Sequence, residues 1–136
     1  MRTVILSDIH SNLEAFSALC RAAEERRVER WIFLGDVVGY GADPQACLAR
    51  MRLLGECPLR GNHDAAVAGQ EDLAYFNEFA REAILWTKAQ LPSDDVDYLG
   101  RLPLTLELED CSAFTLSRWS LVPGGMSVMP TTPIRP

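Results

Sequence analysis

The sequence predicts an α/β fold built mostly from parallel β-α-β units. Two observations carry this prediction. Short apolar runs alternate with segments whose apolar residues recur at helical spacing, through the first two thirds of the chain. In addition, three of the apolar runs are each followed at once by a cluster of polar residues. Ligands of parallel sheets bind beyond the carboxyl ends of the strands, so these clusters are expected to meet at one edge.

Three strands are expected, at residues 3–6 (TVIL), 31–34 (WIFL) and 57–59 (CPL). The first two are continuous apolar runs, which are typical of buried parallel strands. Four helices are expected between and after them. Ser11 and the glutamate of "SNLE" match a capping box at the first helix, and Asp43 is a candidate N-cap of the second. The helical patterns cover residues 12–27, 42–54, 72–91 and 93–102.

Length and composition predict one globular domain in the cytoplasm. The chain has 136 residues and a net charge of −6, which argues against a broad basic face and a nucleic-acid duplex as partner. Its four cysteines form no C-x-x-C pair, as expected for reduced thiols. The first apolar run is too short for a signal peptide, and no run approaches the ~20 apolar residues of a membrane span. No membrane partner is therefore expected.

The three polar clusters are "SDIH" at 7–10, "GDVVGYG" at 35–41 and "GNHD" at 61–64. Crowded carboxylates repel one another and are costly to desolvate, and a divalent cation removes that cost. Oxygen and nitrogen ligands of this mix suit Mn, Fe, Zn, Ni or Mg. The candidate site residues are Asp8, His10, Asp36, Asn62, His63 and Asp64.

Spacing suggests how these residues share two ions. Asp8 and His10 are two residues apart, so on an extended segment their side chains point to the same face and grip one ion. Asp36 has two oxygens and is suited to bridge, and Asn62 offers a carbonyl oxygen to a second ion. Two ions about 3.5–4 Å apart form a clamp for in-line attack on phosphorus.

Each residue also has a structural interpretation when taken alone. Asp8 and Asp36 are placed to cap helices, His10 to sit in a loop, and Asn62 to hold a turn. His63 and Asp64 are also compatible with a hydrogen-bonded surface pair. The order of all three clusters, each after an apolar run, favours the metal site over these separate explanations.

The motifs "D-I-H", "G-D-V-V-G" and "G-N-H-D", in this order, resemble those of the calcineurin-like metallophosphoesterase superfamily, particularly its small bacterial phosphodiesterases. The resemblance covers residues 1 to about 108. It implies the N-terminal half of a four-layer α/β/β/α sandwich. It also implies an enzyme that hydrolyses a small phosphoester with a hydroxide activated by two divalent metal ions.

The resemblance also implies a role for each residue. Asp8, His10 and Asp36 would ligate the first ion, and Asp36 and Asn62 the second. His63 would act as general acid, with Asp64 orienting it. Arg60 is a candidate for supporting phosphate charge, with a solvated strand-end residue as the alternative.

One departure bears on the substrate. Protein phosphatases and dinucleoside tetraphosphatases of this superfamily carry an Asp-Arg pair in "G-D-x-x-D-R-G", where this chain has Gly39 and Tyr40. This disfavours a phosphoprotein or dinucleoside polyphosphate phosphatase and favours a phosphodiesterase, with cyclic nucleotides among the expected substrates.

The resemblance also implies later histidine ligands, yet the chain has two histidines in all. From about Asp110 the sequence becomes Pro-rich and loses its periodicity. We therefore expect an incomplete metallophosphoesterase domain at 1–110 and an atypical tail at 111–136, from truncation or a shifted reading frame. Loss of the histidines predicts weakened activity. The alternative is a non-catalytic remnant that binds metal or self-associates as a homo-oligomer.

Overall fold

The structure is a computed structural model that describes residues 1–55, 58–108 and 112–115. It confirms the α/β class. Strands β1 (Thr3–Leu6) and β2 (Arg30–Phe33) pair in parallel, with Thr3 opposite Arg30 and Leu6 opposite Phe33. The connection between them runs through α1 (Leu13–Glu25), so this part of the chain is the expected β-α-β unit.

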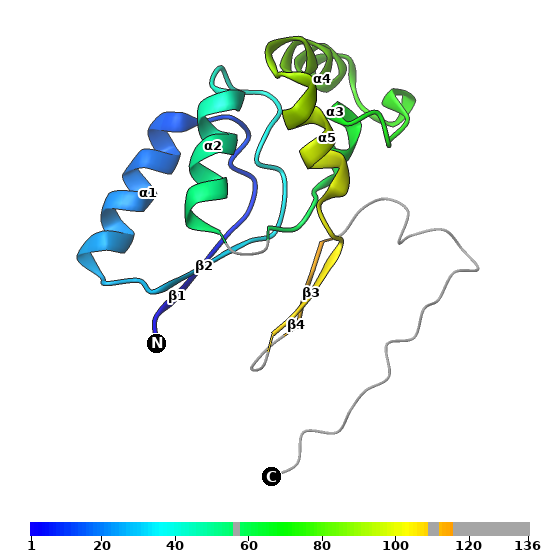
Figure 1. Cartoon of the computed structure of the whole chain (residues 1–136). Coiled ribbons are helices and arrows are strands. Elements are labelled where there is room, and N and C mark those ends of the chain that lie inside the picture. Colours follow the sequence, from blue (N-terminus) through cyan, green and yellow to red (C-terminus); the bar gives the residue numbers. More distant parts are fainter. Residues whose placement is uncertain (56–57, 109–111, 116–136) are drawn as a thin grey trace.

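The remaining helices lie along the strands and near the polar loops that follow them. In Figure 1, α1 and α2 (Pro44–Leu54) lie side by side along the strands, and three further helices gather at the carboxyl ends of β1 and β2. These are α3 (Asn62–Val67), α4 (Glu78–Gln90) and α5 (Ser93–Arg101). The short helix η1 (Leu73–Tyr75) precedes α4, and β3 (Thr105–Glu107) pairs antiparallel with β4 (Ser112–Phe114).

The prediction of a third strand at residues 57–59 was wrong for the residues that the structure describes. Residues 58 and 59 are not in a strand, and Cys57 lies outside the described residues. The Leu59 N–H still donates to the Phe33 carbonyl at 2.8 Å, so the chain runs beside β2 for one hydrogen bond. Pro58 has no N–H, which limits the ladder that this segment can form.

Two helix starts also differ from expectation because asparagines cap them. Asn12, not Ser11, caps α1, and its Oδ1 accepts from the Ala15 N–H at 3.0 Å. The pattern expected at 72–91 is divided at Asn77, which caps α4 by accepting from the Ala80 N–H at 2.9 Å. A side chain that satisfies a free helical N–H fixes the start more strongly than apolar spacing does.

The core lies between the strands and the helices that cover them. Its largest fully buried side chains belong to α1, β2, α2 and the segments that follow. They are Phe16, Phe33, Leu48, Met51, Leu59, Ile84 and Leu99. Because these residues come from β2, four helices and the segment before α3, the loops at the carboxyl ends of β1 and β2 rest on one packed core.

Two further observations bear on the expectations. Of the tail expected at 111–136, only residues 112–115 are described, and 112–114 form β4. No helix in the described part of the chain combines the length and apolar character that crossing a bilayer requires.

Candidate metal centre

The loops that follow β1 and β2 adopt left-handed backbone conformations and hold each other. Asp8, His10, Ser11 and Asp36 have φ of 57°, 48°, 56° and 56°. The first loop is therefore not extended, although the two-residue spacing of Asp8 and His10 had suggested an extended segment. The N–H groups of His10 and Ser11 donate to the carbonyls of Asp36 and Val37, both at 2.9 Å. Such strained residues persist only where surrounding contacts determine them, and they concentrate at functional sites.

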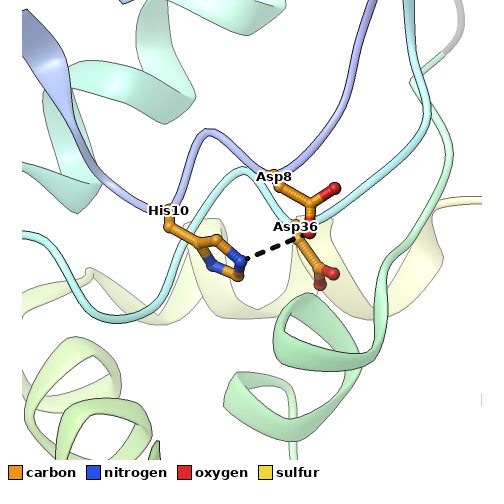
Figure 2. A group of neighbouring side chains, drawn as sticks. All are labelled: Asp8, His10 and Asp36. Atoms are coloured by element: carbon orange, nitrogen blue, oxygen red, sulfur yellow. Dashed lines mark ion pairs between the residues drawn. The ribbon is translucent and has the colours of Figure 1, made fainter. Parts of the chain in front are cut away.

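This arrangement brings three of the predicted ligands together. Asp8, His10 and Asp36 each offer a ligand atom, and these atoms all lie within 4.8 Å of one another. Figure 2 shows the three side chains converging, with His10 Nε2 3.5 Å from Asp8 Oδ1. Ser7 donates its hydroxyl to Asp8 Oδ2 at 2.5 Å, which orients that carboxylate.

The backbone selects the tautomer of His10. Its Nδ1 lies 3.1 Å from the Val38 carbonyl oxygen, which is an acceptor only. A proton therefore lies on Nδ1, which leaves Nε2, on the side of the Asp8 carboxylate, as the ring atom available to a metal ion. A ring nitrogen bonded to a backbone carbonyl is the usual way in which proteins orient a metal-ligating histidine.

Asp36 is the more buried of the two carboxylates in this group. Burial raises its pKa, while the His63 N–H and the charge of His10 oppose that rise and Asp8 adds to it. The His63 N–H donates to Asp36 Oδ1 at 2.8 Å. A cation between these carboxylates would offset their repulsion and the cost of burial.

Asp64 ties the second and third polar clusters together. Its side chain is fully buried. Oδ2 accepts from the N–H groups of Asp36 at 2.8 Å and Gly61 at 3.0 Å, and Oδ1 from those of Val37 at 3.1 Å and Val38 at 3.2 Å. Burial raises the pKa of Asp64 to about 6, and these donors oppose a larger rise. We call these four hydrogen bonds the Asp64 clamp.

The clamp differs from the role expected for Asp64. Both of its oxygens are engaged by backbone N–H groups, so it orients the loop that carries Asp36 and not the ring of His63. The sequence signal for this was present, because an acid at the third position of a helix commonly reaches back to the N-cap N–H.

The ring of His63 lies beside the cluster and contacts three other aromatic rings. Its ring centroid is 4.8 Å from that of His10, 4.7 Å from Tyr40 and 5.2 Å from Phe76. Its Nδ1 is buried and has no hydrogen-bond partner among the described residues. Burial, and then the charge of His10, lower the pKa of His63 to about 4. The imidazole is therefore neutral at pH 7 in the metal-free chain.

This burial predicts a pH dependence of stability. Between pH 6.5 and 4 the unfolded chain protonates His63 and the native chain does not, so the free energy of unfolding falls as the pH falls. The loss from this residue is about 3 kcal/mol over that range. Urea unfolding with a chelator present, for the natural chain and His63→Asn, measures it.

The comparison isolates His63 because other groups titrate in both proteins. The raised pKa of Asp64 acts in the opposite direction between its unfolded value and about 6, and it cancels in the difference. Parallel pH profiles for the two proteins would contradict a buried, neutral His63.

Asn62 and Arg60 are the two remaining residues that the sequence assigned to the site. Asn62 begins α3, and it lines a cavity of about 80 Å³ with Glu71, Tyr75 and Phe76. The guanidinium of Arg60 donates to the side chain of Gln70 and, at 2.6 Å, to the carbonyl of Gly100. It therefore links α5 to the segment after α3, an interaction that differs from both phosphate binding and a solvated strand end.

The chemistry of the donor set fits a divalent cation. Two carboxylates and one imidazole nitrogen stand close enough to touch one ion, and the backbone already orients His10 for that task. First-row divalent metals favour this mix of oxygen and nitrogen. Asp8, His10 and Asp36 would hold such an ion, and a second ion at Asp36 and Asn62 remains a prediction.

Two residues near the cluster were not assigned to the site from sequence. Tyr40 packs edge-on to the ring of His10, with centroids 5.0 Å apart, and the ring of Phe76 packs edge-on to that of His63. Tyr40 stands inside the second polar cluster, which was a usable signal. Phe76 comes from the segment before α4, and no pattern in the sequence linked it to the site.

Comparison with known proteins identifies the family of this chain. The sequence matches the family model of the calcineurin-like phosphoesterases over residues 1–135. An uncharacterised protein from Methanocaldococcus jannaschii is 44% identical over 103 residues, which cover 76% of this chain and 42% of that protein.

Solved structures agree as well. A metallophosphoesterase from Sphaerobacter thermophilus has a TM-score of 0.69 and 40% identity, over 82% of this chain and 45% of its own. A hypothetical protein from Pyrococcus horikoshii has a TM-score of 0.65 at 21% identity, over 75% and 48%, and is a likeness of fold. This chain spans less than half the length of each of these three relatives.

The fold and the site thus define a metallophosphoesterase. The chain belongs to the calcineurin-like phosphoesterase family. Calcineurin-like phosphoesterases hydrolyse phosphate esters with divalent metal ions, and membership of this chain confirms the resemblance found in the three motifs.

Proposed function

We propose that this chain hydrolyses phosphodiesters with divalent ions held by Asp8, His10, Asp36 and Asn62. The observation that carries the proposal is the convergence of the Asp8, His10 and Asp36 ligand atoms within 4.8 Å. Gly39 and Tyr40 stand where phosphatases of the superfamily carry an Asp-Arg pair, which favours a diester over a phosphoprotein.

The chain's own residues supply the negative charge that would hold the ions and the side chains that would position the phosphoester. Bound divalent ions would supply Lewis-acid polarisation of the phosphoester and activation of water. Asp8 and Asp36 would offset the charge of bound ions, and the Val38 carbonyl fixes the ring of His10 so that Nε2 would be available to hold one. His63 lies against His10, where its neutral imidazole is placed to donate a hydrogen bond to an ester oxygen.

Hydrolysis of bis-p-nitrophenyl phosphate with Mn²⁺ tests the proposal. We expect Mn²⁺-dependent turnover that exceeds turnover of the monoester p-nitrophenyl phosphate. Asp36→Asn is expected to lower it by about 100-fold or more, because a bridging carboxylate loses its charge. Asp94→Asn is the matched control, since it removes the same charge from an exposed position on α5.

A binding measurement separates the outcomes. Calorimetric titration with Mn²⁺ reports the metal centre without turnover. A folded chain that binds Mn²⁺ through Asp36 and hydrolyses neither ester would favour the non-catalytic metal-binding alternative. A folded chain for which Asp36→Asn changes neither binding nor turnover would contradict the site itself.

A further inference from the structure

A polar cavity of about 470 Å³ opens beside the candidate metal centre. Asp8 and His10 belong both to the metal-ligand group and to the lining of this cavity. The rest of the lining comes from the start of α1 and from residues 40–43, before α2. A phosphoester whose phosphorus lies at the metal centre has this space for one of its organic groups. The volume is typical of small-ligand sites.

Tyr40 gives this cavity an exposed aromatic wall. Its ring packs against the imidazoles of His10 and His63, yet 52% of the residue is exposed. Its φ of 50° is uncommon for an aromatic residue. The backbone holds it there through the Gly41 N–H, which donates to the His10 carbonyl at 2.9 Å. The ring is therefore fixed beside the cavity and not needed to fill the core.

The charged side chains of the lining, apart from the imidazole of His10, are carboxylates. Besides Asp8, the lining contains the carboxylates of Glu14, in the first turn of α1, and Asp43, at the N-cap of α2. Asp43 makes no capping hydrogen bond with its side chain. None of the described residues that line the cavity is a lysine or an arginine. When an ion takes the charge of Asp8, two carboxylates remain.

We propose that this cavity binds an organic cation, namely the ammonium-bearing alcohol of a phosphodiester substrate. The inference rests on the proposed function and names its substrate class. A quaternary ammonium group gains from the face of Tyr40 and from the charges of Glu14 and Asp43. A second phosphate or a carboxylate in the same place meets like charges and no cationic side chain. The cavity thus selects by charge, next to the bond that is hydrolysed.

A matched pair of substrates tests this selection. The p-nitrophenyl diester of phosphocholine and the p-nitrophenyl 3,3-dimethylbutyl diester release the same leaving group and have the same shape, and they differ by one positive charge. We expect kcat/KM to favour the choline ester by about tenfold. Glu14→Gln, Asp43→Asn and Tyr40→Leu are each expected to bring the ratio toward one. Glu82→Gln, on the exposed face of α4, should leave it unchanged.

Binding of choline provides a readout that does not need turnover. In a calorimetric titration of the metal-free chain, we expect saturable choline binding that weakens in Glu14→Gln and is absent for 3,3-dimethylbutanol. Hydrolysis of both diesters at equal rates would overturn the inference and leave the phosphodiesterase proposal standing. Choline binding without hydrolysis of either diester would support the cavity and count against the proposed activity. Equal choline binding by all variants would overturn the inference.

Discussion

Asp64→Ala is expected to lower the free energy of unfolding by about 4 kcal/mol. The substitution removes the acceptor of four backbone N–H groups, those of Asp36, Val37, Val38 and Gly61. A buried donor without a partner costs about 1–3 kcal/mol, and water that enters the space left by the side chain recovers part of this. Because domains of this size are stable by only about 5–15 kcal/mol, the loss is large. Urea unfolding at pH 7 measures it.

A surface aspartate provides the matched control. Asp72 caps η1 and accepts a single backbone N–H, that of Ala74 at 2.8 Å, from an exposed position. Asp72→Ala is expected to cost about 1 kcal/mol. Equal losses for Asp72→Ala and Asp64→Ala would show that the clamp contributes little beyond one ordinary cap.

A milder change separates stability from metal binding. Asp64→Asn keeps one acceptor oxygen, so we expect a chain that folds but holds Asp36 less firmly. Mn²⁺ affinity, measured by calorimetry on the folded variant, should fall by about 10-fold or more, the usual effect of losing an outer-shell partner. Affinity equal to that of the natural chain would contradict a link between the clamp and the metal centre.

The sequence was sufficient to predict that three candidate ligands meet, because its signal lies in order and spacing. Polar clusters after apolar runs placed Asp8, His10 and Asp36 at one edge, and the structure brings their ligand atoms together. The α/β class followed from the same alternation. These features depend on chain topology, which periodicity reports well.

The geometry within the site was harder to predict from the sequence, because it depends on backbone conformations that composition does not encode. Asp8 and His10 meet through a left-handed loop and not through the expected alternation of an extended strand. The role of Asp64 was mistaken for the same reason. The third position of α3 signals its bond to the Gly61 N–H, but its bonds to the N–H groups of the Asp36 loop appear only once the loops are folded.

Gly61→Ala is the second change for which we expect a large effect. A Cβ at Gly61 would lie 2.1 Å from Asp36 Oδ1 and 2.3 Å from the Asp36 backbone nitrogen. Its φ of −79° suits alanine, so the whole cost comes from this contact and not from backbone conformation. One of the two atoms is main chain and cannot rotate away. We expect a loss of about 3 kcal/mol in the free energy of unfolding, in the range of overpacked sites.

The same contact predicts a loss of function that exceeds the loss of stability. The displaced atom is an oxygen of Asp36, the carboxylate expected to bridge two ions, so Mn²⁺ affinity should fall in the fraction that remains folded. Gly69→Ala is the control: its φ is +79°, but its Cβ would meet only the tip of Lys88, at 3.4 Å. It should cost about 1 kcal/mol through backbone strain and leave Mn²⁺ binding unchanged. Two results together would contradict this prediction: a loss of unfolding free energy in Gly61→Ala no larger than in Gly69→Ala, and normal Mn²⁺ affinity. The close approach of the two loops would then not determine the position of Asp36.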